Sequence, residues 1–220
     1  MKNKVTGQKV YTDEIKKRLK KLRLNIFTFA ELGKLVKADR LILVGLSYDT
    51  LGTKVKASNW KPGDIGEFTH GLKQRLGERL VAYAWVAELQ NNGNMHYHLA
   101  IYVDDFFPYP DKSYQRNGRK YKRLWTHGAS SVDWTPKGVY YLCRYVGKEK
   151  QKDFTKFPKH ARSYAVWFKD RDLQTRFREY LNLRMGSAKK ELYKAEGWQD
   201  WEYLGSGYKL EYLQTIFENR

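Results

Sequence analysis

Two histidines stand one residue apart in the segment NNGNMHYHLAIYV, residues 91–103. The apolar residues that follow them predict a β-strand over residues 96–104. Side chains two residues apart on a strand point to the same face, so His96 and His98 share one face and Tyr97 lies on the other. Two imidazoles placed in this way are either metal ligands or exposed, hydrogen-bonded side chains.

A carboxylate joins the histidines if the chain folds back on itself. Residues 81–89 (VAYAWVAEL) form a second predicted strand, and the QNNGNM segment between the strands has the composition of a turn. A hairpin folded about Asn92 brings Glu88, His96 and His98 to one face, with cross-strand β-carbons roughly 4.5–5.5 Å apart. This set predicts a divalent metal site, and a register shift of one residue would turn Glu88 to the wrong face.

A second group of reactive side chains lies in GVYYLCRYVGKEK, within a helix predicted over residues 135–150. Tyr141, Tyr145 and Lys148 are spaced at i, i+4 and i+7 and therefore share one helical face. A tyrosine stripe is ordinarily part of a core or an interface. Its alternative role is nucleophilic, because a phenol with a pKa near ~10 becomes effective when a metal ion polarises the phosphate under attack.

The remaining periodicity predicts helices and strands around these two motifs. Their order indicates an α+β fold with an antiparallel sheet and flanking helices. We expect a basic helical extension over residues 1–40, a core over residues 41–170 and a C-terminal helical extension packed on that core over residues 171–220. The other predicted helices cover residues 12–38, 67–80 and 173–185, with a short one near Leu210; the other predicted strands cover residues 41–49 and 161–168; residues 105–123 are predicted as a basic loop.

Charge indicates the class of partner. Lys and Arg total 42 against 24 Asp and Glu, a net charge of +18. So large an excess favours a polyanion such as nucleic acid over a merely basic surface, with residues 16–23 and 116–123 as candidate phosphate contacts. The single cysteine excludes an intramolecular disulfide and fits a reducing compartment. The sequence has neither an apolar signal-peptide core nor a membrane-spanning apolar run, so we expect a cytoplasmic protein.

The two motifs together resemble those of the HUH endonucleases, which are named for a His-hydrophobe-His pair. The segment WVAELQNNGNMHYHLAIYV is similar to the motif that carries this pair, and YLCRYVGK is similar to the Y-x-x-x-Y-x-x-K motif of two-tyrosine members. That form is typical of rolling-circle replication initiators of phages and plasmids. The segment LILVGLSYDT is similar to the less specific first motif. The resemblance covers residues 41–168.

This resemblance implies a ferredoxin-like or RNA-recognition-like nuclease core that nicks and rejoins single-stranded DNA. It implies dependence on Mg²⁺ or Mn²⁺, with His96 and His98 matching the metal-binding pair and Glu88 matching the acidic third ligand. Tyr145 matches the tyrosine shared by one-tyrosine and two-tyrosine members. The second tyrosine and the motif lysine are matched by Tyr141 and Lys148.

The implied partners are single-stranded DNA at an origin or hairpin, and a host polymerase that extends the released 3′ end. A helicase partner is also expected, since the sequence contains no G-x-x-x-x-G-K-[ST] segment. A two-tyrosine transposase would carry the same motifs, whereas a relaxase usually adds a third histidine and a longer chain. A non-catalytic single-stranded nucleic-acid-binding module is the remaining alternative, and the intact set of candidate ligands and tyrosines argues against it.

Overall fold

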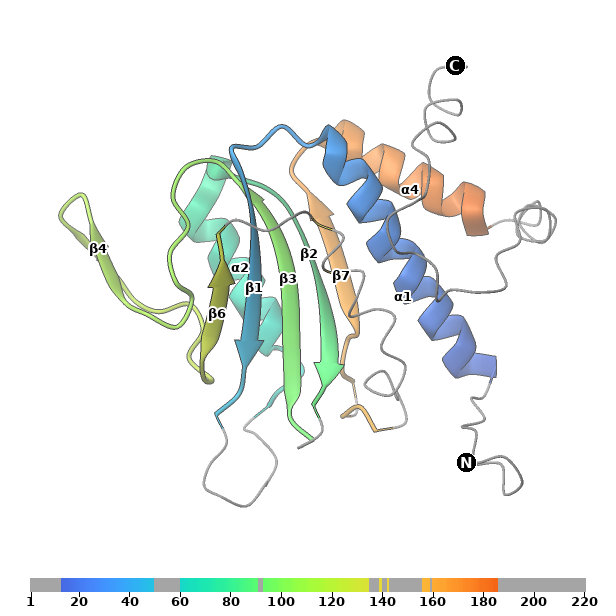
Figure 1. Ribbon diagram of the computed structural model, residues 1–220, viewed down its shortest axis with the longest axis horizontal. Coiled ribbons are helices and arrows are strands. Elements are labelled where there is room, and N and C mark those ends of the chain that lie inside the picture. Colours follow the sequence, from blue (N-terminus) through green and yellow to red (C-terminus); the bar gives the residue numbers. More distant parts are fainter. Residues whose placement is uncertain are drawn as a thin grey trace. The chain divides into compact units, whose positions relative to one another are not determined.

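The computed structural model describes most of the first 185 residues of the chain (Figure 1). The chain divides into two units, residues 1–182 and 183–220, and every contact reported below lies within the first. No helix in the described part is both long enough and apolar enough to cross a membrane. The described residues are 13–49, 60–90, 93–134, 139, 142, 156–158 and 160–185.

Five strands form one antiparallel sheet in the order β6-β1-β3-β2-β7, with β3 at the centre. The three central strands are rich in Val, Leu, Ile, Ala and aromatic residues and are buried on both faces, as expected of a sheet that helices cover. This architecture confirms the predicted α+β fold and is compatible with a ferredoxin-like core. The strands are β1 (Arg40–Ser47), β2 (Leu80–Leu89), β3 (Met95–Val103), β6 (Ser130–Asp133) and β7 (Tyr164–Phe168).

Helix α2 (Asp64–Leu76) covers the face of the sheet to which Tyr97 points. Its apolar residues step by four along one side, and Phe68 and Leu72 are almost fully buried there. Phe68 packs edge-on against Trp125, which in turn contacts Tyr97. The predicted helix over residues 67–80 therefore exists, and it begins three residues earlier, at Asp64.

Helices α1 (Asp13–Leu32) and α4 (Arg171–Met185) contact the opposite face of the sheet, which carries the histidines (Figure 1). Phe29 of α1 and Phe177 of α4 both pack against Phe168 of β7, with ring centroids 5.3 and 5.7 Å apart. Phe29 also contacts Tyr102 near the end of β3. Because Tyr102 lies six residues beyond His96, these contacts are about 20 Å along the strand from the first histidine.

Three parts of the chain differ from the prediction or fall outside the description. The predicted loop over residues 105–123 contains a two-stranded sheet of β4 (Tyr114–Arg116) and β5 (Arg119–Tyr121). Strand β6 was not predicted, because four half-polar residues give no clear period. The predicted helices over residues 135–150 and near Leu210 lie outside the described residues, except for Val139 and Leu142. Two single turns of 3-10 helix, η1 (Gly33–Leu35) and η2 (Gly77–Arg79), complete the structure.

Candidate active site

Strands β2 and β3 pair in the register that the sequence predicted. Glu88 lies opposite His96, and Val86 lies opposite His98. This pairing brings Glu88, His96 and His98 to one face of the sheet, whereas Tyr97 points to the face under α2. The predicted convergence of a carboxylate and two imidazoles is therefore confirmed as a placement on the backbone.

Glu88 and His98 are in direct contact across the hairpin. Glu88 Oε2 and His98 Nε2 lie 2.8 Å apart, and their side chains are only 5% and 13% exposed. A carboxylate buried to this degree needs a strong partner, since desolvation of an isolated charge is costly. The contact is a charge-assisted hydrogen bond when the imidazole is protonated, and it fixes the orientation of the ring in either case.

His96 lies beside His98 and is held by a residue of the neighbouring strand. The two rings stand edge to face, with centroids 4.4 Å apart. A hydrogen bond of 2.9 Å joins His96 Nδ1 to the Ser47 hydroxyl, and Ser47 lies opposite His96 in the β1–β3 pairing. Which of the two atoms donates depends on the tautomer of the ring. Because Nδ1 is engaged, Nε2 is the nitrogen that remains for a ligand.

A glycine keeps the surface next to His96 free of a side chain. Gly45 lies opposite His98 on β1, and a β-carbon built there would lie 3.5 Å from His96 Nε2. The same β-carbon would lie 2.5 Å from the Ser131 hydroxyl, which reaches across from β6. Any larger residue at position 45 would therefore displace the Ser131 hydroxyl and crowd the outer nitrogen of His96.

The donor set suits a divalent metal ion in its chemistry, but only in part in its placement. Two ligands of one ion, bound at right angles at about 2.1 Å, lie about 3 Å apart, which is close to the spacing between Glu88 and His98. Within the described ranges, however, no group of three His, Cys, Asp or Glu side chains is arranged to hold an ion. The structure thus shows a carboxylate–imidazole pair with a second imidazole alongside.

The opposite face of the same strands carries a buried cluster of another kind. Tyr48 donates a hydrogen bond of 2.8 Å to Asp64 Oδ2, and His127 Nε2 lies 3.7 Å from Asp64 Oδ1. Trp60 donates through its indole N–H to the Tyr97 hydroxyl at 2.9 Å. Burial raises the pKa of Tyr48, with further increases from the neighbouring Tyr97 and from Asp64. Burial also raises the pKa of Tyr97. These phenols stay protonated and act in packing.

The predicted nucleophiles lie outside the described residues. Tyr141, Tyr145 and Lys148 belong to this part of the chain, so their distance from the histidines is not described. Val139 and Leu142 are described, and both are buried. The Leu142 N–H donates to the Val139 carbonyl at 3.0 Å, as in a helical turn. Their burial agrees with an apolar side of this segment facing the protein.

Sequence reasoning did not identify Ser47 and Gly45 as neighbours of the histidines. Both follow from alternation along β1 once its pairing with β3 is known, because residues 43, 45 and 47 share the histidine face. That pairing is a non-local contact between strands almost fifty residues apart in sequence. The available signal was a strand that ends in Gly-Leu-Ser, in which a glycine and a hydroxyl interrupt an apolar run on alternate positions.

The fold and the site define an α+β protein with a polar, half-buried cluster on one face of an antiparallel sheet. Residues 42–150 match a family described as replication-associated protein ORF2. The matched span runs from β1 through the histidine hairpin to the end of the predicted tyrosine helix. The match is consistent with a replication initiator and supports a role in DNA replication. A search of curated proteins found no match to the chain.

Proposed function

We propose that this chain is a replication initiator endonuclease that nicks and rejoins single-stranded DNA through a 5′-phosphotyrosine intermediate, in rolling-circle replication. One observation carries the proposal: Glu88 and His98 are in contact across a hairpin, with His96 beside them on the same face. The similarity of residues 42–150 to a replication-associated family supports it independently.

In this proposal Glu88, His96 and His98 would hold a divalent metal ion, Mg²⁺ or Mn²⁺. A bound ion supplies Lewis-acid polarisation of a phosphate and neutralises its charge. His96 would bind through Nε2, because the Ser47 hydroxyl engages Nδ1 and fixes the ring. Glu88 would contribute negative charge as well as a ligand atom, which favours a hard divalent cation.

Tyr145 is the proposed first nucleophile, and Tyr141 is the proposed second. The phenol oxygen attacks the scissile phosphorus and gives up its proton, and the bond from phosphorus to the 3′-oxygen breaks. The 3′-oxygen takes a proton and leaves as a hydroxyl, while the 5′ phosphate stays joined to the tyrosine. Attack by a 3′-hydroxyl on the phosphotyrosine reverses these changes, so rejoining needs no ATP. Lys148, about one helical turn from Tyr145, would neutralise phosphate charge or stabilise the phenolate.

The proposed setting is the cytoplasm of a host cell. The released 3′-hydroxyl is a primer for a host polymerase, and a separate helicase would unwind the duplex. The net charge of +18 supports a polyanionic substrate. A second tyrosine would allow a second cleavage while the first is still occupied, which would release a circle.

A covalent adduct is the direct test of this proposal. The purified protein is mixed with a labelled single-stranded oligonucleotide and Mn²⁺, and the mixture is separated on a denaturing gel. A labelled band at the mass of protein plus DNA is expected, and its loss with EDTA would show the need for a metal ion. Absence of any adduct across a panel of oligonucleotides would favour a non-catalytic nucleic-acid-binding module.

Tyrosine variants identify the nucleophile in the same assay. Tyr145→Phe is expected to abolish or sharply reduce the adduct, and Tyr141→Phe is the matched control one helical turn away. If each single variant keeps full yield, either tyrosine is sufficient, and the double variant decides. An adduct that persists in the double variant would place the nucleophile elsewhere and overturn this part of the proposal.

A further inference from the structure

The segment between β3 and β6 forms a small two-stranded ribbon that is separate from the main sheet. Strands β4 and β5 pair antiparallel, with Tyr114 opposite Tyr121 and Arg116 opposite Arg119. The connecting residues Asn117 and Gly118 have φ values of 49° and 74°. Positive φ at both central positions defines a type I′ turn, whose twist matches that of the strands. The ribbon is thus a tight hairpin with a defined tip.

The base of the ribbon is fixed to the edge of the main sheet. Asp111 accepts hydrogen bonds from the Ser130 N–H at 3.2 Å and the Ser130 hydroxyl at 2.7 Å. The Pro110 carbonyl accepts the N–H groups of Leu124 and Trp125 at 2.7 and 2.8 Å, so the two ends of the segment meet. Trp125 is fully buried. Figure 1 shows the ribbon beyond the edge strand β6, to which these contacts attach it.

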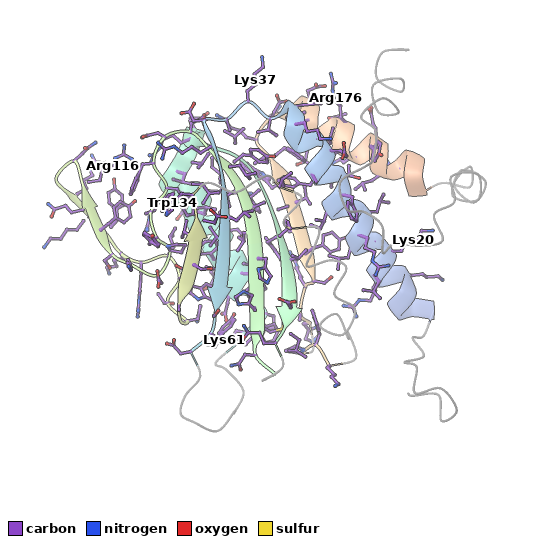
Figure 2. The ribbon with its side chains drawn as sticks, viewed as in Figure 1. Lys20, Lys37, Lys61, Arg116, Trp134 and Arg176 are labelled. Carbon is purple, nitrogen blue, oxygen red and sulfur yellow. The ribbon has the colours of Figure 1, made fainter. Side chains whose placement is uncertain are left out.

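The aromatic residues of the ribbon are used to hold it in place. The rings of Tyr114 and Tyr121 are stacked, with centroids 4.9 Å apart and planes at 10°. The Arg75 guanidinium of α2 lies 5.8 and 5.6 Å from the two ring centroids. Arg116 is also engaged, through a 2.6 Å ion pair with Asp105 and a contact with the Phe106 ring (Figure 2). These contacts fix the direction in which the ribbon points.

The remaining cations of the ribbon face solvent. Residues 112–123 contain six Lys and Arg and no Asp or Glu. Two cations belong to β5, Arg119 and Lys120, and two follow it directly, Lys122 and Arg123; all four are exposed. No carboxylate of the described chain forms an ion pair with any of these four. The ribbon is therefore a rigid arm with an uncompensated positive surface.

We infer that the β4–β5 ribbon binds double-stranded DNA, with its exposed cations on the phosphates and its tip in the major groove. The major groove of B-DNA is about 12 Å wide and admits a two-stranded β-ribbon. Proteins that hold single strands use free aromatic faces on which unpaired bases stack, and the ribbon's own tyrosines are stacked on each other beside Arg75. The inference rests on the proposed function for the presence of DNA, and it assigns the duplex and the single strand to different parts of the protein.

The test compares duplex and single-stranded affinity by fluorescence anisotropy over a range of salt concentrations. The probes are a labelled duplex of about two helical turns and one of its strands alone. The variant is Arg119→Gln with Lys120→Gln. The control is Lys37→Gln with Arg178→Gln, which removes the same charge from two exposed residues outside the ribbon (Lys37 is labelled in Figure 2). Circular dichroism checks that both double variants fold.

The ribbon variant is expected to lose between about tenfold and a hundredfold in duplex affinity at 0.1 M salt, and its salt slope is expected to fall by about two, because each phosphate contact contributes about 0.9. Single-stranded affinity and the control variant should change far less. Unchanged duplex affinity would overturn the inference. An equal loss for both probes would also overturn it, since the ribbon would then be a single-strand contact.

The adduct assay separates this inference from the proposed function. The ribbon variant should form the covalent adduct on a single-stranded oligonucleotide as well as the wild-type protein does. If the wild-type protein forms no adduct but the ribbon variant still loses duplex affinity, the proposed nuclease function fails and the ribbon stands. If the adduct forms but duplex affinity does not depend on the ribbon, the ribbon inference fails and the nuclease function stands.

Discussion

The central strand β3 presents two unlike surfaces, and the contrast between them explains the design of the site. On one face His96 and His98 lie half-buried, in contact with Ser47 and Glu88 from the strands on either side. On the other face Tyr97 is fully buried among aromatic rings and accepts a hydrogen bond from an indole. Alternation along one strand therefore separates groups that can do chemistry from groups that hold the strand in place.

The two faces also differ in what their polar groups cost and provide. Burying Glu88 and two imidazoles near the surface of a sheet stabilises the fold less than apolar residues would, so their retention indicates a role beyond folding. The opposite face contains buried phenols that remain protonated, because burial raises the pKa of both Tyr48 and Tyr97. We therefore expect substitutions on the histidine face to change chemistry and substitutions on the Tyr97 face to change stability.

The largest effect is expected from His96→Ala combined with His98→Ala. Loss of an outer-shell partner of a metal site typically costs 10- to 100-fold, and loss of two direct ligands should cost more than about 100-fold in adduct formation. The rate is measured per folded molecule on the denaturing gel. Tyr97→Phe, between the two histidines but on the other face, is the control and should keep its rate. Equal rates for the double variant and the wild-type protein would rule out the proposed site.

Next in size is the effect of Phe68→Ala on the free energy of unfolding. Phe68 is 2% exposed and packs against Trp125 beneath the sheet. Removing a buried ring of this size should lower the free energy of unfolding by about 3–5 kcal/mol, as measured by urea denaturation. The adduct rate per folded molecule should stay at the wild-type value. A large fall in that rate would show that the two faces do not act separately.

Ser47→Ala tests the histidine face more finely. The hydroxyl engages His96 Nδ1, so its loss frees the ring to rotate and should slow adduct formation by about 10- to 100-fold. Ser47→Thr keeps a hydroxyl on the β-carbon and should recover most of the rate. Equal rates for the alanine and threonine variants would contradict a role for the hydroxyl in orienting His96.

The smallest effect concerns Asp111, which holds the edge strand β6 at the base of the ribbon. Burial raises the pKa of this carboxyl, but hydrogen bonds from the Ser130 hydroxyl and N–H lower it, and the net change is downward from the usual value of 3.8. Asp111 therefore stabilises the fold above its unfolded-state pKa, and the contribution disappears as the pH falls through the lower folded-state pKa.

Asp111→Asn should accordingly lower the free energy of unfolding at pH 7 by less than about 1 kcal/mol, because the group is partly solvated. Urea denaturation of both proteins between pH 7 and pH 3 measures the difference. The difference should shrink toward acid pH and be smallest below the usual range for Asp. A difference that grows as the pH falls would mean that the pKa of Asp111 is raised in the folded protein.

Local patterns in the sequence were enough to predict the histidine hairpin and the helix below it. The Gly/Asn-containing turn fixed the register that places Glu88 opposite His96, and a step of four along residues 68–80 marked α2. These signals work because turn chemistry and helical spacing act between residues close in sequence. The same reasoning gave the α+β class from the order of the elements.

Contacts between distant segments could not be predicted in this way. Ser47 meets His96 only because β1 pairs with β3, and no local pattern specifies that pairing. The ribbon was taken for a loop because β4 and β5 are three residues each, although Asn117-Gly118 is a strong hairpin signal. The roles of Tyr141 and Tyr145 remain predictions from motif spacing and from the resemblance.

Pulsed electron paramagnetic resonance of bound Mn²⁺ tests the central claim most directly, since it detects the ¹⁴N nuclei of coordinated imidazoles. The wild-type protein should bind Mn²⁺ with clear nitrogen coupling, and this coupling should disappear when His96 and His98 are both replaced by Gln. A protein that forms the DNA adduct while its Mn²⁺ shows no imidazole nitrogen, or shows the same coupling after both substitutions, would contradict a metal site on the histidine face.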